Sequence, residues 1–462
     1  MTYTFVALFL LMIGYVIYLN AFRADDLNSN RYNTKHDANL DKYIRGPILS
    51  SDGSVLAQTQ TNEDGTETRV YPYANIFAHV IGYSTNGKSG LESYCSNDLL
   101  DSHASVLTQL KDQNDRKTMG DTVVVTLNAT LQNSAYQALG SYNGAVIALE
   151  PKTGKILAMV SKPDYDPNVI GEIWESVITD SSSSVLLNRA TQGLYPPGST
   201  FKILTTLAYM RQRPIDYKKF SFDCNSQLTV NDVTIRCYNS TVHGKVDLEG
   251  AFAHSCNAAF AQIGLNLDDR EFHSMCEELL FNKALPTTLQ HSTSQFVLNE
   301  DSSYGEEMTT AIGQGNTLVT PLHMALLTAA IANGGIMMKP YLVDHIEAVD
   351  GVLVSKTAPA KYKRVMTTEE SRILTEMMKE TVAGGTATEL SWYGFTAAGK
   401  TGSAEYGANG NEGTHSWFVG FSNVYDPDLV VAVIAEDGGT GSQTAVPIAA
   451  QVFQTYYSIK EN

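Results

Sequence analysis

The chain has 462 residues, 43% of them hydrophobic and 18% charged, which is an ordinary globular composition and enough chain for two to four domains. Its formal net charge is 32 − 49 = −17. This excess of acid argues against a surface for nucleic acid or anionic lipid, because both are bound by Lys and Arg. Solubility is a sufficient reason for the acidity.

The first 22 residues contain no charged side chain, and residues 4–19 are nearly all apolar. With its flanks this stretch is just long enough to cross a bilayer as a helix. A cleaved signal peptide is the alternative, but such peptides have a charged start, a shorter apolar run and a small-x-small cleavage site. The sequence therefore predicts an uncleaved transmembrane anchor over residues 1–22.

The next part of the chain carries weaker patterns. Residues 45–57, R-G-P-I-L-S-S-D-G-S-V-L-A, predict a short β-hairpin that turns at Asp52-Gly53. Residues 58–120 are mixed and weakly periodic. We expect residues 23–120 to form a small juxtamembrane pedestal module without chemistry of its own.

The patterns become clearer from residue 121. V-V-V-T-L, from residue 123, predicts a strand, and a helix capped by Asn128 follows it. Residues 144–160 predict two strands around a tight turn. Residues 162–190, which include four consecutive serines, predict a long polar connection.

Mostly helical patterns fill residues 199–390, interrupted by a hairpin pattern near residues 222–238. Three strand patterns and a closing helix then complete the chain, and the strands cover residues 395–405, 415–423 and 428–436. Strands from both ends of this region therefore enclose a helical middle. We expect residues 121–462 to be one α+β domain, an antiparallel sheet flanked by helices.

The five cysteines show neither C-x-x-C nor Cys/His metal spacing, and the histidines are scattered, which predicts no metal site. Cys224 and Cys237 flank the hairpin pattern, whose ends would meet at disulfide distance. Two interpretations stay open. The pair forms a disulfide, which an outward-facing compartment permits, or both cysteines stay reduced and pack as apolar residues.

A lysine stands one turn after a serine in the apolar stretch L-Y-P-P-G-S-T-F-K-I-L, as Ser199 and Lys202. The preceding Pro-Pro-Gly would start a helix at Ser199. A buried lysine loses its proton more easily and can then act as a base toward a serine nucleophile. Taken alone, the motif is better explained by a helix-capping serine and a lysine whose amine reaches the surface.

Two further motifs carry polar groups. Ser255 and Asn257 flank Cys256, and their hydroxyl and amide could line a cleft. A helix cap explains these two residues as well. Cys256 is expected to be a small buried residue that packs in the core. The last motif consists of Lys400, Thr401, Gly402 and Ser403. On a strand edge, its lysine and hydroxyls could bind a carboxylate, and its glycine would let a substrate backbone approach closely. Alternatively, it is simply a hairpin strand with an exposed lysine.

Together, the order S-x-x-K, S-x-N, K-T-G resembles the motif set of penicillin-binding proteins and class A β-lactamases. With Y-P-P-G-S-T-F-K, L-L-N-R-A-T-Q-G and A-I-G-Q-G-N-T-L-V-T-P, the chain resembles a class B penicillin-binding protein, a peptidoglycan D,D-transpeptidase, over essentially its whole length. The resemblance implies a serine transpeptidase/β-lactamase-like fold for residues 121–462. Ser403 departs from the threonine that is common in the family.

The resemblance implies that Ser199 is the acylated nucleophile and Lys202 its general base. Ser255 and Asn257 would relay protons and hold the substrate amide. The substrate would be the D-Ala-D-Ala end of a stem peptide, which β-lactam antibiotics mimic, and no cofactor is expected.

At the other end of the substrate, the resemblance implies that Lys400 and Thr401 position the terminal carboxylate. The backbone N–H groups of Ser199 and Ser403 would form the oxyanion hole. The chain lacks room for a glycosyltransferase domain, which implies a polytopic membrane glycan polymerase as partner and a catalytic domain on the extracytoplasmic side.

Two alternatives remain. The same chemistry would serve a D,D-carboxypeptidase, a β-lactamase or a β-lactam sensor, which differ in the acceptor of the acyl group. Class A β-lactamases carry an E-x-x-N element after the middle motif, and none occurs between Asn257 and Lys400. A catalytically idle scaffold of a cell-wall complex is the other alternative, and the complete motif set argues against it.

Overall fold

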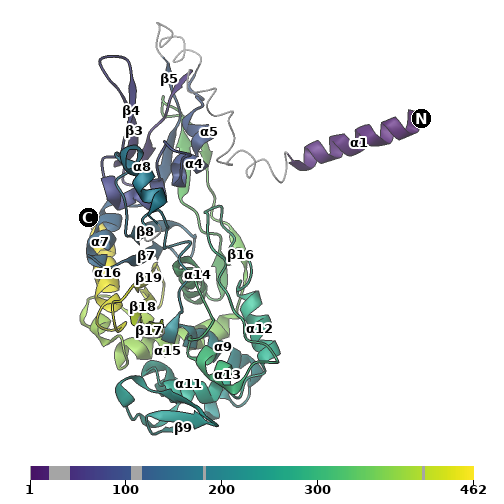
Figure 1. Cartoon of the computed structure of the whole chain (residues 1–462), viewed down its shortest axis with the longest axis vertical. Coiled ribbons are helices and arrows are strands. Elements are labelled where there is room, and N and C mark those ends of the chain that lie inside the picture. Colours follow the sequence, from purple (N-terminus) through teal and green to yellow (C-terminus); the bar gives the residue numbers. More distant parts are fainter. Residues whose placement is uncertain (1, 20–41, 106–116, 181–183, 408–411, 462) are drawn as a thin grey trace. The chain divides into compact units, whose positions relative to one another are not determined.

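The computed structural model describes residues 2–19, 42–105, 117–180, 184–407 and 412–461 (Figure 1). Its contacts divide the chain into two compact units. Unit 1 is made of Met1–Val125, Tyr165–Ser183 and Val343–Thr357, and unit 2 of Thr126–Asp164, Ser184–Leu342 and Ala358–Asn462. The sequence predicted the pedestal module and the catalytic domain to meet once, between residues 120 and 121, whereas here two later segments of the chain return to unit 1.

The N-terminal helix α1 spans Thr2–Tyr18, and its apolar side chains are exposed. The sequence predicted a membrane anchor here. Across the described parts of the chain, no helix combines the length and the apolar character needed to cross a membrane. Residues 20–22 of the predicted anchor lie outside the described residues.

Unit 1 is built on a six-stranded sheet in the order β15-β14-β6-β2-β3-β4. Its strands are β2 (Ile48–Leu49), β3 (Val55–Thr61), β4 (Glu67–Val70), β6 (Thr122–Val125), β14 (Val343–Glu347) and β15 (Leu353–Lys356). The predicted hairpin over residues 45–57 is confirmed, because β2 and β3 pair antiparallel. A two-stranded parallel sheet accompanies it, made of β1 (Tyr43–Ile44) and β5 (Thr118–Met119).

Short helices complete unit 1, and one of them was missed. They are η3 (Ala74–Phe77), α3 (Ala78–Ile81), α4 (Gly90–Tyr94), α5 (Ser96–Leu99) and α8 (Ile170–Thr179). The sequence predicted only a polar connection over residues 162–190. The apolar residues of I-G-E-I-W-E-S-V-I-T recur at spacings of three and four, so the helical period of α8 was present but masked by the serines that follow.

Unit 2 contains the predicted antiparallel sheet, in the order β17-β18-β19-β7-β8. The strands are β7 (Gly144–Leu149), β8 (Ile156–Lys162), β17 (Ala397–Tyr406), β18 (Gly413–Ser422) and β19 (Leu429–Ala435). Every residue of β19 is buried, and this strand lies at the centre, as its uniformly apolar sequence predicted. Strand β17 forms one edge.

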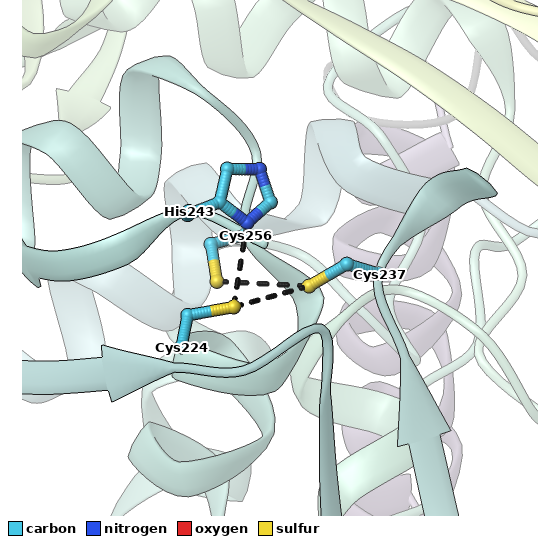
Figure 2. A group of neighbouring side chains, drawn as sticks. All are labelled: Cys224, Cys237, His243 and Cys256. Carbon is cyan, nitrogen blue, oxygen red and sulfur yellow. Dashed lines mark hydrogen bonds between the residues drawn. The ribbon is translucent and has the colours of Figure 1, made fainter. Parts of the chain in front are cut away.

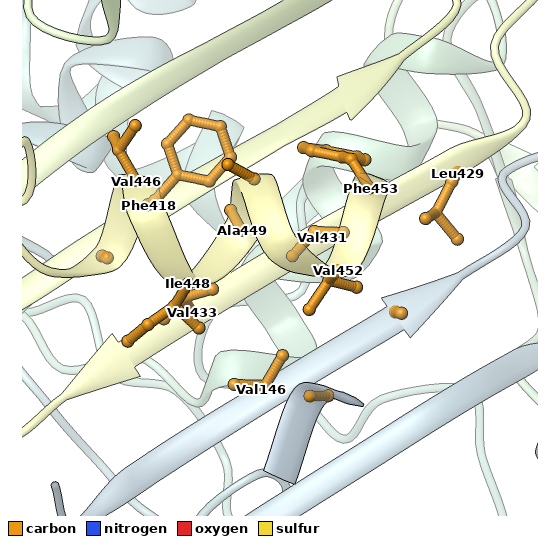
Figure 3. Close-up of a cluster of buried hydrophobic side chains, with 14 of the residues drawn as sticks. Val146, Phe418, Leu429, Val431, Val433, Val446, Ile448, Ala449, Val452 and Phe453 are labelled. Carbon is orange, nitrogen blue, oxygen red and sulfur yellow. The ribbon is translucent and has the colours of Figure 1, made fainter. Parts of the chain in front are cut away.

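Helices cover both faces of this sheet. On one face, α7 (Ala129–Leu139) and α16 (Ala445–Glu461) bury a continuous apolar cluster that includes Val431, Val433 and Phe453 (Figure 3). Helix α14 (Pro321–Ala332) packs on β19 and β7 with residues outside this cluster, so it covers the other face. The sheet is therefore a rigid support for its edge strand. The Asn128 side chain caps α7, as predicted, by accepting from the N–H of Leu131 at 2.9 Å.

The rest of unit 2 is largely helical, as predicted. It contains α9 (Lys202–Gln212), α10 (Leu248–Ala253), α11 (Asn257–Gly264), α12 (Asp269–Glu278), α13 (Tyr304–Ala311) and α15 (Thr368–Ala383), with the 3₁₀ turns η4 (Gly198–Phe201), η5 (Tyr217–Lys219), η6 (Tyr238–Ser240) and η7 (Thr388–Trp392). The predicted hairpin near residues 222–238 is confirmed by β10 (Gln227–Val230) and β11 (Val233–Arg236), and it is bracketed by β9 (Ser221–Cys224), which pairs with β12 (Gly244–Asp247).

Besides β12, four strands inside the region predicted to be helical were missed. They are β14 and β15 of unit 1 and the antiparallel pair β13 (Ile336–Met338) and β16 (Lys361–Arg364) of unit 2. Each has at most five residues, and their side chains are mostly half-buried or exposed. A short strand without a buried face gives little alternation of polar and apolar residues.

Candidate active site

The Ser199–Lys202 motif forms the start of α9. Ser199 is half-buried in the 3₁₀ turn η4, and Lys202 is the first residue of the α-helix. The Lys202 side chain is fully buried. Its Nζ donates to the Ser255 carbonyl oxygen at 2.8 Å, to Ser255 Oγ at 3.1 Å and to Asn257 Oδ1 at 2.6 Å. The alternative of a lysine that reaches the surface is therefore wrong.

Burial controls the charge of this lysine. Removal from water lowers the pKa of Lys202 to about 7, although the nearby thiols of Cys256 and Cys237 favour its charged form. Lys400 is also fully buried, and burial together with the charge of Lys202 holds its pKa well below the usual range. Because burial lowers the pKa of Lys202 to about 7, a large share of this side chain at neutral pH is a neutral amine, which is a base.

Ser255 and Asn257 come from the turn between α10 and α11. Ser255 has a φ of +57°, in the left-handed region that side chains rarely occupy. Asn257 begins α11 and donates through Nδ2 to the Arg236 carbonyl oxygen at 2.9 Å, which leaves Oδ1 to accept from Lys202. The middle motif is thus joined directly to the first one.

The Lys400–Ser403 motif lies on the edge strand β17, beside η4. A Cβ atom at Gly402 would lie 3.1 Å from both the Pro197 carbonyl oxygen and Thr200 Cγ2, so η4 packs directly on this glycine. A Cβ at Gly198 would lie 2.8 Å from the Ser403 carbonyl oxygen. The sequence predicted that a substrate backbone would approach Gly402, and in the structure η4 also lies close to this glycine. The Thr401 hydroxyl hydrogen-bonds that of Thr386.

Several residues hold this arrangement without belonging to the motifs. Trp417 Nε1 on β18 donates to the Pro196 carbonyl oxygen at 3.0 Å, and the Gly441 N–H donates to Ser403 Oγ at 3.3 Å. The Gly198 N–H donates to the Gly313 carbonyl oxygen at 2.8 Å. The glycine-rich run E-D-G-G-T-G that follows the buried strand β19 was the available signal for Gly441.

We expect Gly313→Ala to disturb the site from outside the motifs. Gly313 has a φ of +76°, and a Cβ there would lie 2.0 Å from the Gly198 carbonyl oxygen. The clash must displace η4, so we expect a loss of about 2–3 kcal/mol in the free energy of unfolding and slower acylation by penicillin. Thermal unfolding and the acylation rate measure both effects.

Gly315→Ala is the matched control for this substitution. Gly315 has the same φ of +76°, but its nearest neighbour would be Thr309 Oγ1 at 3.4 Å, an ordinary contact. The two variants share the backbone strain and differ in the clash. Equal acylation rates in both would contradict a role of Gly313 in placing η4.

The five cysteines are all free thiols, and three of them lie together. Cys224 Sγ and Cys237 Sγ are 3.7 Å apart, so the hairpin brings them close as the sequence predicted, but in the reduced form. Cys256 and His243 join the same group (Figure 2). The sequence predicted no metal site because these four residues, spread over residues 224–256, lack the close C-x-x-C or Cys/His spacing of a metal-binding turn.

Comparison with known families agrees with this geometry. Residues 144–454 match the family model of the penicillin binding protein transpeptidase domain, and residues 45–123 match that of the penicillin binding protein A dimerisation domain. The chain belongs to the class B penicillin-binding proteins. The predicted serine transpeptidase/β-lactamase-like fold is therefore confirmed, and the segment that matches the dimerisation domain covers most of the predicted pedestal module, residues 23–120, and extends three residues beyond it.

Three proteins similar to this penicillin-binding protein match it over nearly their whole length. The peptidoglycan D,D-transpeptidase PbpA of Mycolicibacterium smegmatis is 33% identical and aligns with 96% of this chain and 94% of its own length. A solved structure of penicillin-binding protein A from M. tuberculosis, a penicillin G acyl-enzyme complex, is similar with a TM-score of 0.81 at 30% identity, covering 90% of this chain and 100% of that chain. The D,D-transpeptidase domain of a peptidoglycan glycosyltransferase from Eggerthella lenta gives a TM-score of 0.81 at 31% identity, covering 91% of this chain and 99% of that chain.

Proposed function

We propose that Ser199 is the nucleophile of this serine-type D-Ala-D-Ala transpeptidase and that Lys202 is its general base. The observation that carries the proposal is the fully buried Lys202 amine, with a pKa of about 7, one helical turn from Ser199. In the acylation step, the Ser199 hydroxyl attacks the carbonyl carbon between the two D-Ala residues and gives its proton to the Lys202 amine. The terminal D-Ala leaves as the amine, protonated through Ser255.

The second half of the reaction reverses the proton path. An amine of a second stem peptide attacks the acyl-serine, loses a proton to the lysine–serine pair, and forms the cross-link as Ser199 Oγ recovers its hydrogen. Asn257 would hold the substrate amide while it accepts from Lys202. The backbone N–H groups of Ser199 and Ser403 would stabilise the negative oxygen of each tetrahedral intermediate.

Lys400 and Thr401 would bind the terminal carboxylate. Lys400 is buried and its pKa lies well below the usual range in the absence of a counter-charge. A bound carboxylate would provide that charge and favour protonated Lys400, and this in turn would favour neutral Lys202 through repulsion. Substrate binding would thereby prepare the base for its task.

The same proposal covers the setting of the enzyme. The apolar, exposed helix α1 supports an anchor over residues 1–22, which would place the catalytic domain, residues 121–462, on the extracytoplasmic side. Residues 23–120 would be the pedestal that separates the two. Glycan strands would come from a polytopic membrane polymerase acting as partner.

The fate of the acyl-enzyme separates the transpeptidase from a β-lactamase. The chain has no E-x-x-N element between Asn257 and Lys400 that would supply a base for a deacylating water. We therefore expect the penicilloyl-enzyme to survive for minutes or longer, with negligible turnover of penicillin. Release of labelled penicillin from the purified protein measures this lifetime.

The control for this experiment is the acceptor. An amine such as a D-amino acid, added with a thioester or peptide analogue of the stem, should capture the acyl group in preference to water. Multiple turnovers of penicillin per second would identify a β-lactamase instead. Hydrolysis of the stem analogue that is insensitive to added amine would identify a carboxypeptidase.

A further inference from the structure

Four potential metal ligands converge beside the middle motif of the active site. They are Cys224 at the end of β9, Cys237 directly after β11, His243 in the loop before β12, and Cys256 at the start of α11. The three sulfurs and the imidazole nitrogen all lie within 4.8 Å of one another. Figure 2 shows the four side chains pointing toward a common centre.

The spacing of these atoms matches a tetrahedral zinc site. Zn–S bonds of about 2.3 Å and Zn–N bonds of about 2.0–2.1 Å place two sulfurs about 3.8 Å apart and a sulfur and a nitrogen about 3.6 Å apart. The Sγ atoms of Cys224 and Cys237 are 3.7 Å apart, and those of Cys237 and Cys256 are 3.8 Å apart. Cys224 Sγ and His243 Nδ1 are 3.4 Å apart.

The surroundings suit a thiolate–imidazole site. The three cysteines are buried, with exposed fractions of 0% for Cys224, 3% for Cys237 and 0% for Cys256, while His243 is half-buried and leaves a route from solvent. The backbone N–H of Ala259 donates to Cys256 Sγ at 3.5 Å. A sulfur at the N-terminus of α11 is thus placed where negative charge is favoured.

Two simpler explanations account for less of this arrangement. Cysteines packed as apolar residues would not require the His243 ring nitrogen to face a sulfur. A disulfide between Cys224 and Cys237 would draw one pair of sulfurs to about 2.05 Å and leave Cys256 and His243 without a role. The two sulfur–sulfur separations are instead nearly equal, as a shared central ion requires. Three thiolates and one imidazole favour Zn²⁺ over harder divalent cations.

We propose that Cys224, Cys237, His243 and Cys256 bind one Zn²⁺ ion, and that this ion holds Ser255 and Asn257 against Lys202. The first part stands on the cluster alone, and the second part rests on the proposed function.

Two of the four ligands are neighbours in the sequence of residues that contact Lys202 or Asn257. Cys256 lies between Ser255 and Asn257, both of which accept from Lys202 Nζ. Cys237 follows Arg236, whose carbonyl oxygen accepts from Asn257 Nδ2. Ser255 keeps a left-handed φ of +57°, a conformation that persists only where the surroundings impose it. The four ligands are therefore positioning residues, and zinc would impose this local structure.

Metal binding is tested on the purified full chain without any catalytic assay. We expect about one zinc per chain by elemental analysis after expression with Zn²⁺, and X-ray absorption with sulfur neighbours at about 2.3 Å. Cys224→Ser and His243→Ala should lose zinc, whereas Cys276→Ser, a buried cysteine of α12 outside the cluster, should keep it. Wild-type protein that takes up no zinc under reducing conditions, or that contains a Cys224–Cys237 disulfide when isolated, would overturn the proposal.

The positioning role is tested by removing the ion from the wild type. At a temperature well below unfolding, a chelator should slow penicillin acylation by about 10–100-fold, and Zn²⁺ but not Mg²⁺ should restore it. Val452→Ala is the control for a general loss of stability. Val452 lies on the buried face of α16, far from the motifs in the sequence, and this variant should keep the wild-type acylation rate. Unchanged acylation after complete zinc removal overturns the positioning role alone. A zinc-loaded wild type that penicillin does not acylate leaves the metal site standing and rejects the proposed function.

Discussion

Ser199→Ala should abolish covalent labelling by a fluorescent penicillin. The β-lactam ring is an activated amide, and its opening requires a nucleophile that stays bonded to the drug. Ser199 lies in η4, which is held by the hydrogen bond from the Gly198 N–H to Gly313 and by its packing on the edge strand β17, so the nucleophile is fixed at the start of α9. We expect the rate to fall by at least about four orders of magnitude, as when other serine nucleophiles are removed.

Gel fluorescence measures this loss directly. Ser391→Ala, an exposed serine of the 3₁₀ turn η7 in the same unit, is the matched control and should label like the wild type. Thermal unfolding must show that Ser199→Ala is folded. Stoichiometric labelling of the folded variant would mean that another residue is the nucleophile.

Much of unit 2 was predictable because its signals are local. The strands of the central sheet are apolar runs bounded by turns, and β19 is buried on both faces, so its sequence alone indicates its central place. The three motifs were recognisable by order and residue type. Their predicted roles stay predictions until the substitutions are made.

What the sequence missed depends on pairing between distant segments. Strand β14 pairs with β6, more than 200 residues earlier, and its half-buried side chains carry no clear alternation. The Cys/His cluster gathers ligands from two strand ends, a loop and a helix start, none of which has the close spacing of a metal-binding turn. The three hydrogen bonds of Lys202 Nζ to Ser255 and Asn257 were not predictable either, because these residues lie more than 50 positions away in the sequence. Residue type predicted the chemistry, whereas only the fold brings Ser255 and Asn257 to the amine.

Lys202→Met should slow penicillin acylation by about 10²–10⁴-fold, the usual effect of removing a positioned general base. Methionine keeps the length and removes the amine, so it can fill the fully buried volume between α9 and α11. Lys379→Met, at a partly exposed lysine of α15, is the control and should leave the rate unchanged. A Lys202→Met rate within a few-fold of the wild type would rule out this lysine as the base.

The pH dependence of the same reaction identifies which form of Lys202 acts. Burial lowers the pKa of Lys202 to about 7, so the neutral amine becomes the major form as the pH rises through that value, and the wild-type acylation rate should rise with it. Besides burial, the thiols of Cys256 and Cys237 act on the pKa of this amine, and they favour its charged form. In Lys202→Met this rise of the acylation rate with pH should be absent. A wild-type rate that is flat between pH 5 and about 8 would show that the amine is not the proton acceptor.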